Sequence, residues 1–402
     1  MKEGSRSVMP RFMEVLIVLY VFHTTLPIFG YFIPAAVHGA AVLLLFALLA
    51  VYDRSFVRNL GKVLPVFAIY FLSIVYHGFS NFAMEMYGLL QLVLYPMLAL
   101  YLMQHAGEKA LKRMLIFIGL SYVATAITTY IGNQMFPLAS RQLAAIFQSD
   151  EVYMYDVYMK MNIGGFNFIY ALVLLTPAVI FLIRSKNIPF LVGILLLVLF
   201  GATVIISEYT TALLSFLLIL LSLLFLRKDF GGKQIGLLMT VAFIVVIVFD
   251  QLLFPQLTQL TGLFGSEAID ARLTEMSDFS TSGGASEGDL GSRINLYGIS
   301  LNSFIQSPLW GSPNAKFGGH SYVFDNLARY GLLGLLGMIW MYRQMYRLYY
   351  KPLKNADFYG YALFTFAMAI LLALLNPKDN LSVLTFMIPV IGSYFSKKTQ
   401  QR

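Results

Sequence analysis

The sequence predicts an all-α polytopic membrane protein with about twelve transmembrane helices. Of its 402 residues, 58% are hydrophobic and only 12% are charged, which is about half the charged share of an average soluble chain. Apolar runs of about twenty residues recur along the whole chain, and each is long enough to cross a bilayer as a helix. These observations exclude a soluble enzyme, a nucleic-acid-binding protein and a β-barrel, whose strands would alternate in shorter segments.

Each expected span is an apolar run bounded by a polar connection. The first run follows basic residues, as in a signal peptide, but it continues to about Phe32 without a convincing cleavage site. We therefore interpret it as a retained first span. In chain order, the expected spans cover roughly residues 13–33, 35–52, 63–80, 85–104, 114–134, 164–183, 188–206, 209–226, 235–254, 322–342, 357–375 and 381–396.

Charge patterning predicts the orientation of these spans. If both termini are cytoplasmic, the inner segments hold most of the 28 Lys and Arg residues. This is the asymmetry expected of cytoplasmic loops, and it also accounts for the net charge of +8 without nucleic acid. Acidic residues gather near the outer face instead. The basic residues on the outer side are Arg141, Lys160, Arg272, Arg293, Lys316, Arg329 and Lys378.

A single integral membrane domain over 1–402 is expected, with two long outer connections at 135–163 and 255–320. Long loops in a compact fold are usually functional or disordered. Charged residues are scarce inside the spans and no internal repeat is visible, which argues against an ion-coupled transporter. The absence of cysteine excludes disulfides and thiolate metal sites.

The second outer connection contains a predicted interfacial helix within 289–313. Apolar residues recur at helical spacing from Ile294 to Ile305. Ser292 is a reasonable N-cap and would put Arg293 in the first turn. Unpaired N–H groups and a guanidinium suit a diphosphate. The alternative is a helix on the membrane surface with Arg293 facing water or lipid headgroups.

The next segment brings ionisable residues to the start of the span at 322. Two glycines precede His320, and Asp325 and Arg329 lie four residues apart on one face of a helix. Charges there are tolerable only if they face a wet protein interior. His320 is thus either a general base or hydrogen-bonding group, or a plain interface histidine. Asp325 and Arg329 either position a ligand or pair with each other.

Three further features of the outer side are candidates for binding or catalysis. Glu208 lies in a very short turn within ISEYTTALLSF (206–216), where it is either a base or sugar ligand or an ordinary turn residue. Arg141, in the first long connection, is likewise either a functional residue or an ordinary residue of that connection. The stretch EVYMYDVYMKMN (151–162) fits an interfacial aromatic belt or a surface that stacks on sugars. No Walker loop, GxGxxG, HExxH or DxD pattern supports nucleotide hydrolysis or metal catalysis.

Several of these segments together resemble the O-antigen polymerases and ligases. The string R-x(14)-P-x-x-G from Arg293 to Gly311, followed by GGHSYVFDNLARYGLLG, resembles their late outer-loop signature. The expected architecture is similar to these families as well, with twelve spans and a large external loop between the ninth and tenth. The turn SEYTTAL before the eighth span is also similar to theirs.

The polymerase branch is the closer resemblance. Ligases typically have His-Asn before a leucine-rich span, whereas this chain has His320-Ser321. The late segment NPKDNLSVLTFMIPVIG (376–392) also resembles polymerases. One departure concerns Glu208, because ligases commonly have arginine after the serine of that turn. Another arginine must then supply the second positive charge for a diphosphate.

The resemblance implies a GT-C-like fold and a glycosyltransferase, independent of metals and cofactors, on the outer face of the bacterial cytoplasmic membrane. Donor and acceptor would both be oligosaccharides on undecaprenyl diphosphate, and a chain-length regulator is an implied partner. The implied roles are base or hydroxyl-orienting group for His320 and second base for Glu208, diphosphate ligands for Arg293, Arg272 and Arg141, and sugar or acceptor positioning for Asp325, Arg329 and Tyr322.

Two alternatives stay open. An O-antigen ligase would use the same chemistry with lipid A core as acceptor. A lipid-linked oligosaccharide transporter would predict charged residues inside the spans and internal repeats.

Overall fold

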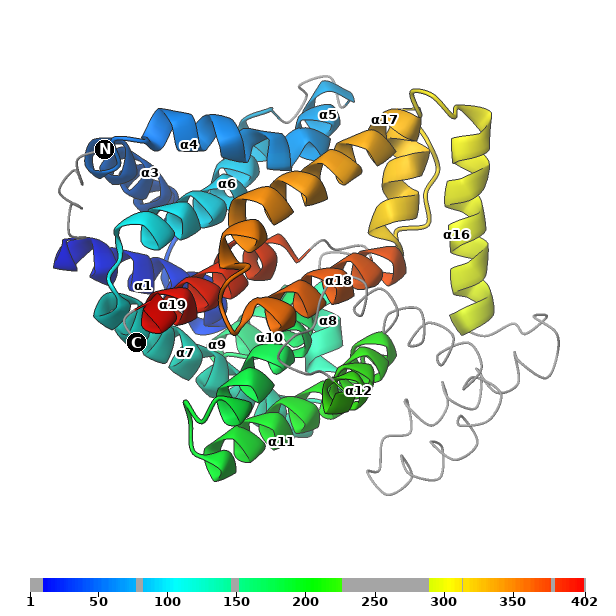
Figure 1. Ribbon diagram of the computed structural model, residues 1–402. Coiled ribbons are helices and arrows are strands. Elements are labelled where there is room, and N and C mark those ends of the chain that lie inside the picture. The colour runs from blue at the N-terminus through cyan, green and yellow to red at the C-terminus, as the bar shows by residue number, and fades with distance from the viewer. Residues whose placement is uncertain are drawn as a thin grey trace.

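The computed structural model describes residues 10–76, 82–145, 152–225, 289–312, 314–376 and 380–400, and these residues form helices without any strand (Figure 1). The helices of the first half are α1 (Arg11–Thr25), α2 (Pro27–Phe32), α3 (Ala35–Tyr52), α4 (Phe56–Val63), η1 (Leu64–Phe67), α5 (Ala68–Tyr76), α6 (Phe82–His105), α7 (Glu108–Met135), α8 (Ala139–Ala145) and α9 (Val152–Lys160). Those of the second half are α10 (Phe166–Arg184), α11 (Phe190–Ile206), α12 (Thr210–Phe225), α16 (Asp289–Gln306), α17 (Tyr322–Met345), η4 (Tyr346–Tyr350), η5 (Lys351–Leu353), α18 (Tyr359–Leu375), η6 (Val383–Met387) and α19 (Ile388–Gln400).

The all-helical class and the presence of membrane-crossing helices agree with the prediction. Helices lie in the described part of eleven of the twelve expected ranges, and the remaining range, 235–254, lies outside the described residues. Within the described residues, four helical segments are both long and apolar enough to cross a membrane, while four further apolar helices are shorter. The four are Phe56–Val75, Gly88–His105, Glu108–Met135 and Phe166–Arg184. The full count of twelve spans stays a prediction.

The first expected span is not a continuous helix, which corrects the prediction for 13–33. Leu26 adopts an extended conformation (φ −106°, ψ 102°), so α1 ends at Thr25 and α2 begins at Pro27. Proline lacks an N–H and disfavours helical geometry in the residue before it. The side chain of Asn162 accepts a hydrogen bond from the Ile28 amide at 3.2 Å, which satisfies one amide of the first turn of α2.

Both long connections that were expected on the outer side contain helices. The connection over 135–163 holds α8 and α9, and the described part of 255–320 holds α16. A helix therefore exists where the interfacial helix was predicted, but it begins at Asp289. Ser292 is consequently inside the helix and does not cap it, and Arg293 lies beyond the first turn.

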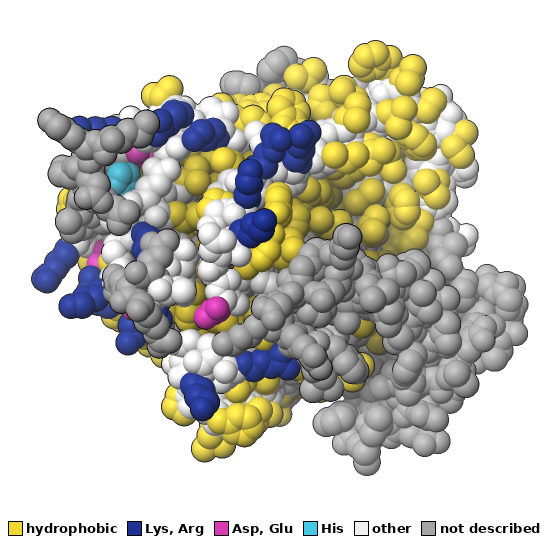
Figure 2. All heavy atoms as spheres, in the orientation of Figure 1, with side chains coloured by type: hydrophobic (Ala, Val, Ile, Leu, Met, Phe, Trp, Pro, Cys, Tyr) yellow, Lys and Arg dark blue, Asp and Glu magenta, His cyan; other side chains and the backbone are white. Residues whose placement is uncertain are grey.

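The helices form a bundle with two distinguishable ends. Figure 1 shows that α1 begins and α19 ends at one end, whereas α16 lies crosswise at the other. Most of the visible Lys and Arg side chains lie toward the first end (Figure 2). Helix α10 is the most enclosed of these four apolar segments, with 72% of its apolar stretch buried inside the protein against 33–56% in the others.

Two π-helical turns, η4 and η6, interrupt the last helices of the bundle. Buried tyrosine hydroxyls of η4 donate to backbone carbonyls of neighbouring helices. Tyr349 donates to the Pro96 carbonyl in α6 at 3.0 Å, and Tyr350 donates to the Leu384 carbonyl in η6 at 3.0 Å. Irregular backbone inside an apolar bundle is tolerated where side chains satisfy its polar groups in this way.

Candidate functional site

A cavity of about 1000 Å³ opens among helix ends on the side of the bundle away from the chain termini. Its wall includes the end of α1, helices α2, α8 and α9, the start of α10, the turn between α11 and α12, and the segment before α17. Asn376 and Ser382 complete the wall after α18, and Tyr95 and Tyr122 extend it into the bundle. The cavity is large enough for a sizeable organic ligand.

Arg141 is held at this wall by the hydrogen bonds of its neighbour Ser140. Asn133 in α7 accepts from the Ser140 amide at 3.1 Å and donates to the Ser140 hydroxyl at 2.7 Å. That hydroxyl donates in turn to the Gly164 carbonyl at 2.8 Å. The half-buried Arg141 guanidinium lines the cavity and makes no hydrogen bond or ion pair with any other residue that the structure describes.

The turn that carries Glu208 contributes a different side chain from the one predicted. Glu208 has φ of 55°, and it is not among the residues that line the cavity. Its neighbours Tyr209 and Thr211 do line the cavity. The Tyr209 hydroxyl donates to the Ser140 carbonyl at 2.8 Å, and the Arg141 charge lies close enough to interact with this tyrosine. Of this turn, Tyr209 and Thr211 line the cavity, while the role of Glu208 as a base stays a prediction.

His320 lines the same cavity from the segment that precedes α17. Ser321 caps this helix by accepting from the Phe324 amide at 3.2 Å, so His320 lies just outside the helix and not in its first turn. The Tyr322 amide donates to the Asn376 carbonyl at 2.8 Å. The fold thus brings together His320 and Arg141, which are far apart in the sequence.

The glycines before His320 allow a close approach to α16. Gly319 has φ of +73°, in the region that favours glycine. A Cβ at Gly318 would lie 2.4 Å from the Leu296 carbonyl oxygen. Only glycine fits between these backbones without displacing one of them.

Asp325 and Arg329 line a second, smaller cavity of about 310 Å³ beside the first, together with Tyr322. The two residues do not form the ion pair that was one alternative from the sequence. Asp325 Oδ1 instead accepts from the Ser300 hydroxyl at 2.8 Å, and the Arg329 guanidinium stacks 3.7 Å from the centre of the Phe317 ring. Gly319 lines both cavities, so this segment adjoins the two.

The other two predicted arginines are not positioned by the structure. Arg293 belongs to α16, but its side chain lies outside the described part of the chain. Arg272 lies outside the described residues altogether.

Several cavity residues were not singled out in the sequence. Tyr170 and Asn376 meet through a hydrogen bond of 3.0 Å from the tyrosine hydroxyl to the amide oxygen, and both line the cavity. Tyr155, from the predicted tyrosine-rich stretch, lines it too. Burial, followed by the Asp156 charge, raises the pKa of Tyr155, so its hydroxyl stays a neutral donor. One feature of the sequence could have singled out Asn376, because it is a polar residue that precedes a proline at the end of an apolar run.

Among the described residues, no group of three or more His, Asp or Glu side chains could hold a metal ion. Comparison with protein-family models finds no match to the chain, and comparison with curated proteins finds none either. The described residues define an all-helical protein with helices long and apolar enough to cross a membrane and with a large cavity at one end of the bundle.

Proposed function

We propose that this chain polymerises oligosaccharide repeat units linked to undecaprenyl diphosphate, at the outer face of a bacterial cytoplasmic membrane. The observation that carries the proposal is the common cavity of His320 and Arg141, a base candidate and a cation. The resemblance of the segments around Arg293 and His320 to O-antigen polymerases supplies the substrate class. In this proposal both chain termini are cytoplasmic, the spans number twelve, and the fold is GT-C-like.

The reaction is a glycosyl transfer without a nucleotide. A sugar hydroxyl of the acceptor attacks the anomeric carbon of the donor, and the bond between that carbon and the diphosphate oxygen breaks. His320 takes the hydroxyl proton, a contribution of ~10²–10⁴-fold in general base catalysis. Undecaprenyl diphosphate leaves with the bonding electrons, and Arg141 stabilises its charge. One such preorganised group is worth about 10²–10³ in rate.

The cavity walls suit the sugars of such substrates. Tyr155, Tyr170 and Tyr209 line the cavity, and Asn167 adds an amide. Aromatic rings stack on the apolar faces of sugars, while polar tips bind their hydroxyl groups. The adjoining smaller cavity contributes Arg329 for acceptor positioning.

The surrounding helices suit the lipid part of the substrates. Large apolar side chains are exposed on the outside of α7 and α11, including Ile127, Ile131 and Val198. A polyprenyl tail lying along such helices stays in the hydrocarbon region while the diphosphate reaches the cavity that Arg141 lines. The proposal that a chain-length regulator is a partner depends on the resemblance alone.

The proposed reaction is tested by deleting the gene for this chain in its native bacterium and resolving the surface polysaccharide on a gel. We expect single repeat units at the surface in place of polymer. Complete loss of surface sugar, with full-length polymer accumulating on undecaprenyl diphosphate, would identify a ligase instead. An unchanged pattern would contradict both.

His320→Ala and Arg293→Ala test the site. Each is expected to abolish polymerisation while expression and membrane insertion persist. Wild-type polymer length in both variants would contradict the assignment of these residues to the site.

A further inference from the structure

The segment that carries His320 is held by a buried pair of side chains from two different helices. Ser300 of α16 is fully buried, and Asp325 of α17 is 9% exposed. The Ser300 hydroxyl donates to Asp325 Oδ1 at 2.8 Å and accepts from the Gly318 amide at 3.0 Å. Asp325 Oδ1 also accepts from the Gly319 amide at 3.3 Å. Two consecutive amides before His320 are thus bound by one side-chain pair.

A second anchor lies immediately after His320. The Tyr322 amide donates to the Asn376 carbonyl, and the Asn376 side chain accepts from Tyr170. Only His320 and Ser321 lie between the two anchors. The backbone on both sides of the histidine is therefore bound, which restricts where its ring can go in the cavity.

The same pair joins α16 to α17. Figure 1 shows α16 beside the first part of α17, and Ser300 is the residue of α16 that contacts Asp325. Arg293 stands about two helical turns before Ser300 in the same helix. The pair therefore sets the distance between the helix that carries Arg293 and the segment that carries His320.

We propose that Ser300 and Asp325 are positioning residues, which hold the Gly318–His320 segment so that the histidine faces the acceptor hydroxyl in the large cavity. This inference rests on the proposed glycosyl transfer and changes the role of Asp325 from contacting sugar to placing His320. A displacement of a catalytic group by about 1 Å costs on the order of 10²-fold in rate. Loss of the pair should lower kcat and leave KM nearly unchanged, because substrate contacts elsewhere persist.

The test compares Asp325→Ala with Asp325→Asn in full-length protein reconstituted in nanodiscs, with a purified lipid-linked repeat unit as substrate. An asparagine side chain still offers an oxygen to Ser300 and Gly319, whereas alanine offers none. We expect a loss of kcat of about 10²-fold for Asp325→Ala and less than about tenfold for Asp325→Asn. Equal losses in both variants would overturn the proposal, since a carboxylate that contacts substrate needs its charge.

A double-mutant cycle with His320→Ala sharpens the result. If Asp325 acts only through the histidine, Asp325→Ala causes no further loss in the His320→Ala background. Additive losses would show that Asp325 contacts the substrate itself. Ser303→Ala is the matched control, because Ser303 lies one turn further along α16 and bonds to the Lys316 carbonyl at 2.6 Å. Its kcat should stay within about threefold of wild type, since it does not bind the two amides next to His320.

A second readout needs no activity. Hydrogen–deuterium exchange of the amides of 318–322 should accelerate in Asp325→Ala and Ser300→Ala and stay near wild type in Asp325→Asn and Ser303→Ala. If wild-type protein transfers no sugar but this exchange pattern holds, the proposed function fails and the anchoring of the segment stands. Unchanged exchange in all variants would refute the anchoring itself.

Discussion

Arg141 has an unusual environment for a charged residue. Its guanidinium is half-buried at the cavity wall, and no described carboxylate pairs with it. A guanidinium at a cavity wall that has no carboxylate partner is open to an anionic ligand, and it fits phosphate oxygens with two parallel hydrogen bonds.

Arg141→Ala is therefore expected to lower the rate of polymerisation by about 10²-fold or more. Arg141→Lys should recover only a minor part, because an ammonium cannot form the two-pronged contact. The measurement is the initial rate with a lipid-linked repeat unit. Arg113→Ala is the control, because Arg113 is exposed and pairs with Glu14 near the start of α7. A normal rate in Arg141→Ala would remove this residue from the site.

Tyr209 is a residue whose ring and hydroxyl have separable roles. The ring packs edge-on against Phe166, with the centroids 5.4 Å apart, and the hydroxyl bonds to the Ser140 carbonyl next to Arg141. We expect Tyr209→Phe to keep the packing and to lower activity less than Tyr209→Ala, with thermal stability near wild type. Melting curves and initial rates in the same detergent check this. Equal rates in the two variants would show that the ring does not shape the cavity.

At the scale of elements, the joint between α16 and α17 decides where His320 lies. α17 bends at Gly331, whose φ of 58° and ψ of −146° are accessible almost only to glycine. The Pro308 carbonyl accepts from the Leu332 amide at 2.8 Å, so the segment after α16 docks on this bend. A Cβ at Gly331 would lie 2.6 Å from the Pro308 oxygen, and one at Gly311 would lie 2.1 Å from the Arg329 oxygen.

Gly331→Ala should therefore be strongly destabilising, since both the backbone conformation and the contact forbid a side chain. Strain of this kind costs about 1–3 kcal/mol before any clash is counted. Gly298→Ala in α16 is the matched control, because a Cβ there meets nothing within 4 Å and alanine favours helix. The melting temperature in detergent should fall for the first variant and hold or rise for the second. The same fall in both would argue against a special bend.

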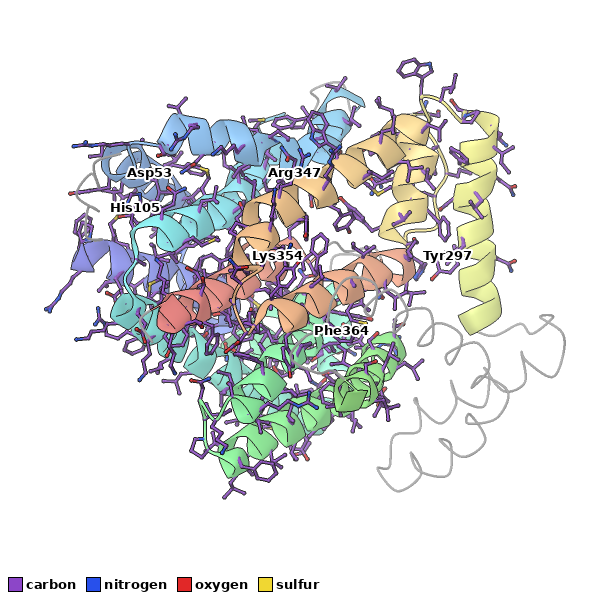
Figure 3. All side chains as sticks on the ribbon, viewed as in Figure 1. Asp53, His105, Tyr297, Arg347, Lys354 and Phe364 are labelled. Carbon is purple, nitrogen blue, oxygen red and sulfur yellow. The ribbon has the colours of Figure 1, made fainter. Side chains whose placement is uncertain are left out.

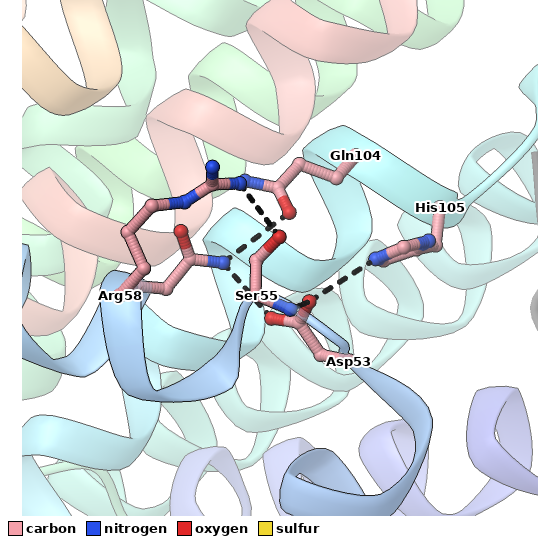
Figure 4. Close-up of polar contacts among 6 residues, drawn as sticks. Asp53, Ser55, Arg58, Gln104 and His105 are labelled. Carbon is pink, nitrogen blue, oxygen red and sulfur yellow. Dashed lines mark hydrogen bonds and ion pairs between the residues drawn. The ribbon is translucent and has the colours of Figure 1, made fainter. Parts of the chain in front are cut away.

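At the scale of the molecule, the two ends of the bundle have separate tasks. Figure 3 shows Asp53 and His105 at one end and Tyr297 at the other. The buried Asp53 carboxylate accepts from the Ser55 amide at 2.8 Å and from Asn59 at 2.9 Å, and lies 3.5 Å from His105 (Figure 4). Asn59 also donates to Gln104 at 3.2 Å. This cluster ties the turn after α3 to the end of α6, and none of its members lines the large cavity.

Asp53→Ala is accordingly expected to lower stability without changing the chemistry. Loss of hydrogen bonds to a charged group costs about 2 kcal/mol, so the free energy of unfolding should fall. The chemistry should not change, because α3, with 18 residues, spans about 27 Å between this turn and its other end. The melting temperature should fall while the rate per folded molecule stays near wild type. Asp357→Ala, at an exposed aspartate, should change neither. A large fall in kcat for Asp53→Ala would show that the two ends are coupled.

The helical class and most helix ranges could be predicted because an apolar run of about twenty residues has few other ways to satisfy its backbone in lipid. The break before Pro27 and the bend at Gly331 were not predicted, since the length of each apolar run outweighed the proline and the glycine. His320 and Arg141 could be proposed because ionisable residues at the end of an apolar run are costly without a function. Whether they share a site could not be predicted, because no local pattern relates residues so distant in the chain.

Sequence alone thus determined that the apolar runs are largely helical and which polar residues stand at their ends, because both follow from local hydrophobicity and spacing. Only the tertiary structure decided which of them meet. Asp325 and Arg329 are neighbours by helical spacing, yet Asp325 binds Ser300 because α16 packs across the start of α17. The backbone at Glu208 is left-handed, and the next residue, Tyr209, lies beside Ser140. Tyr209 therefore lines the cavity, whereas Glu208 does not. Partners of this kind depend on how helices pack against one another, and that is set by the whole bundle.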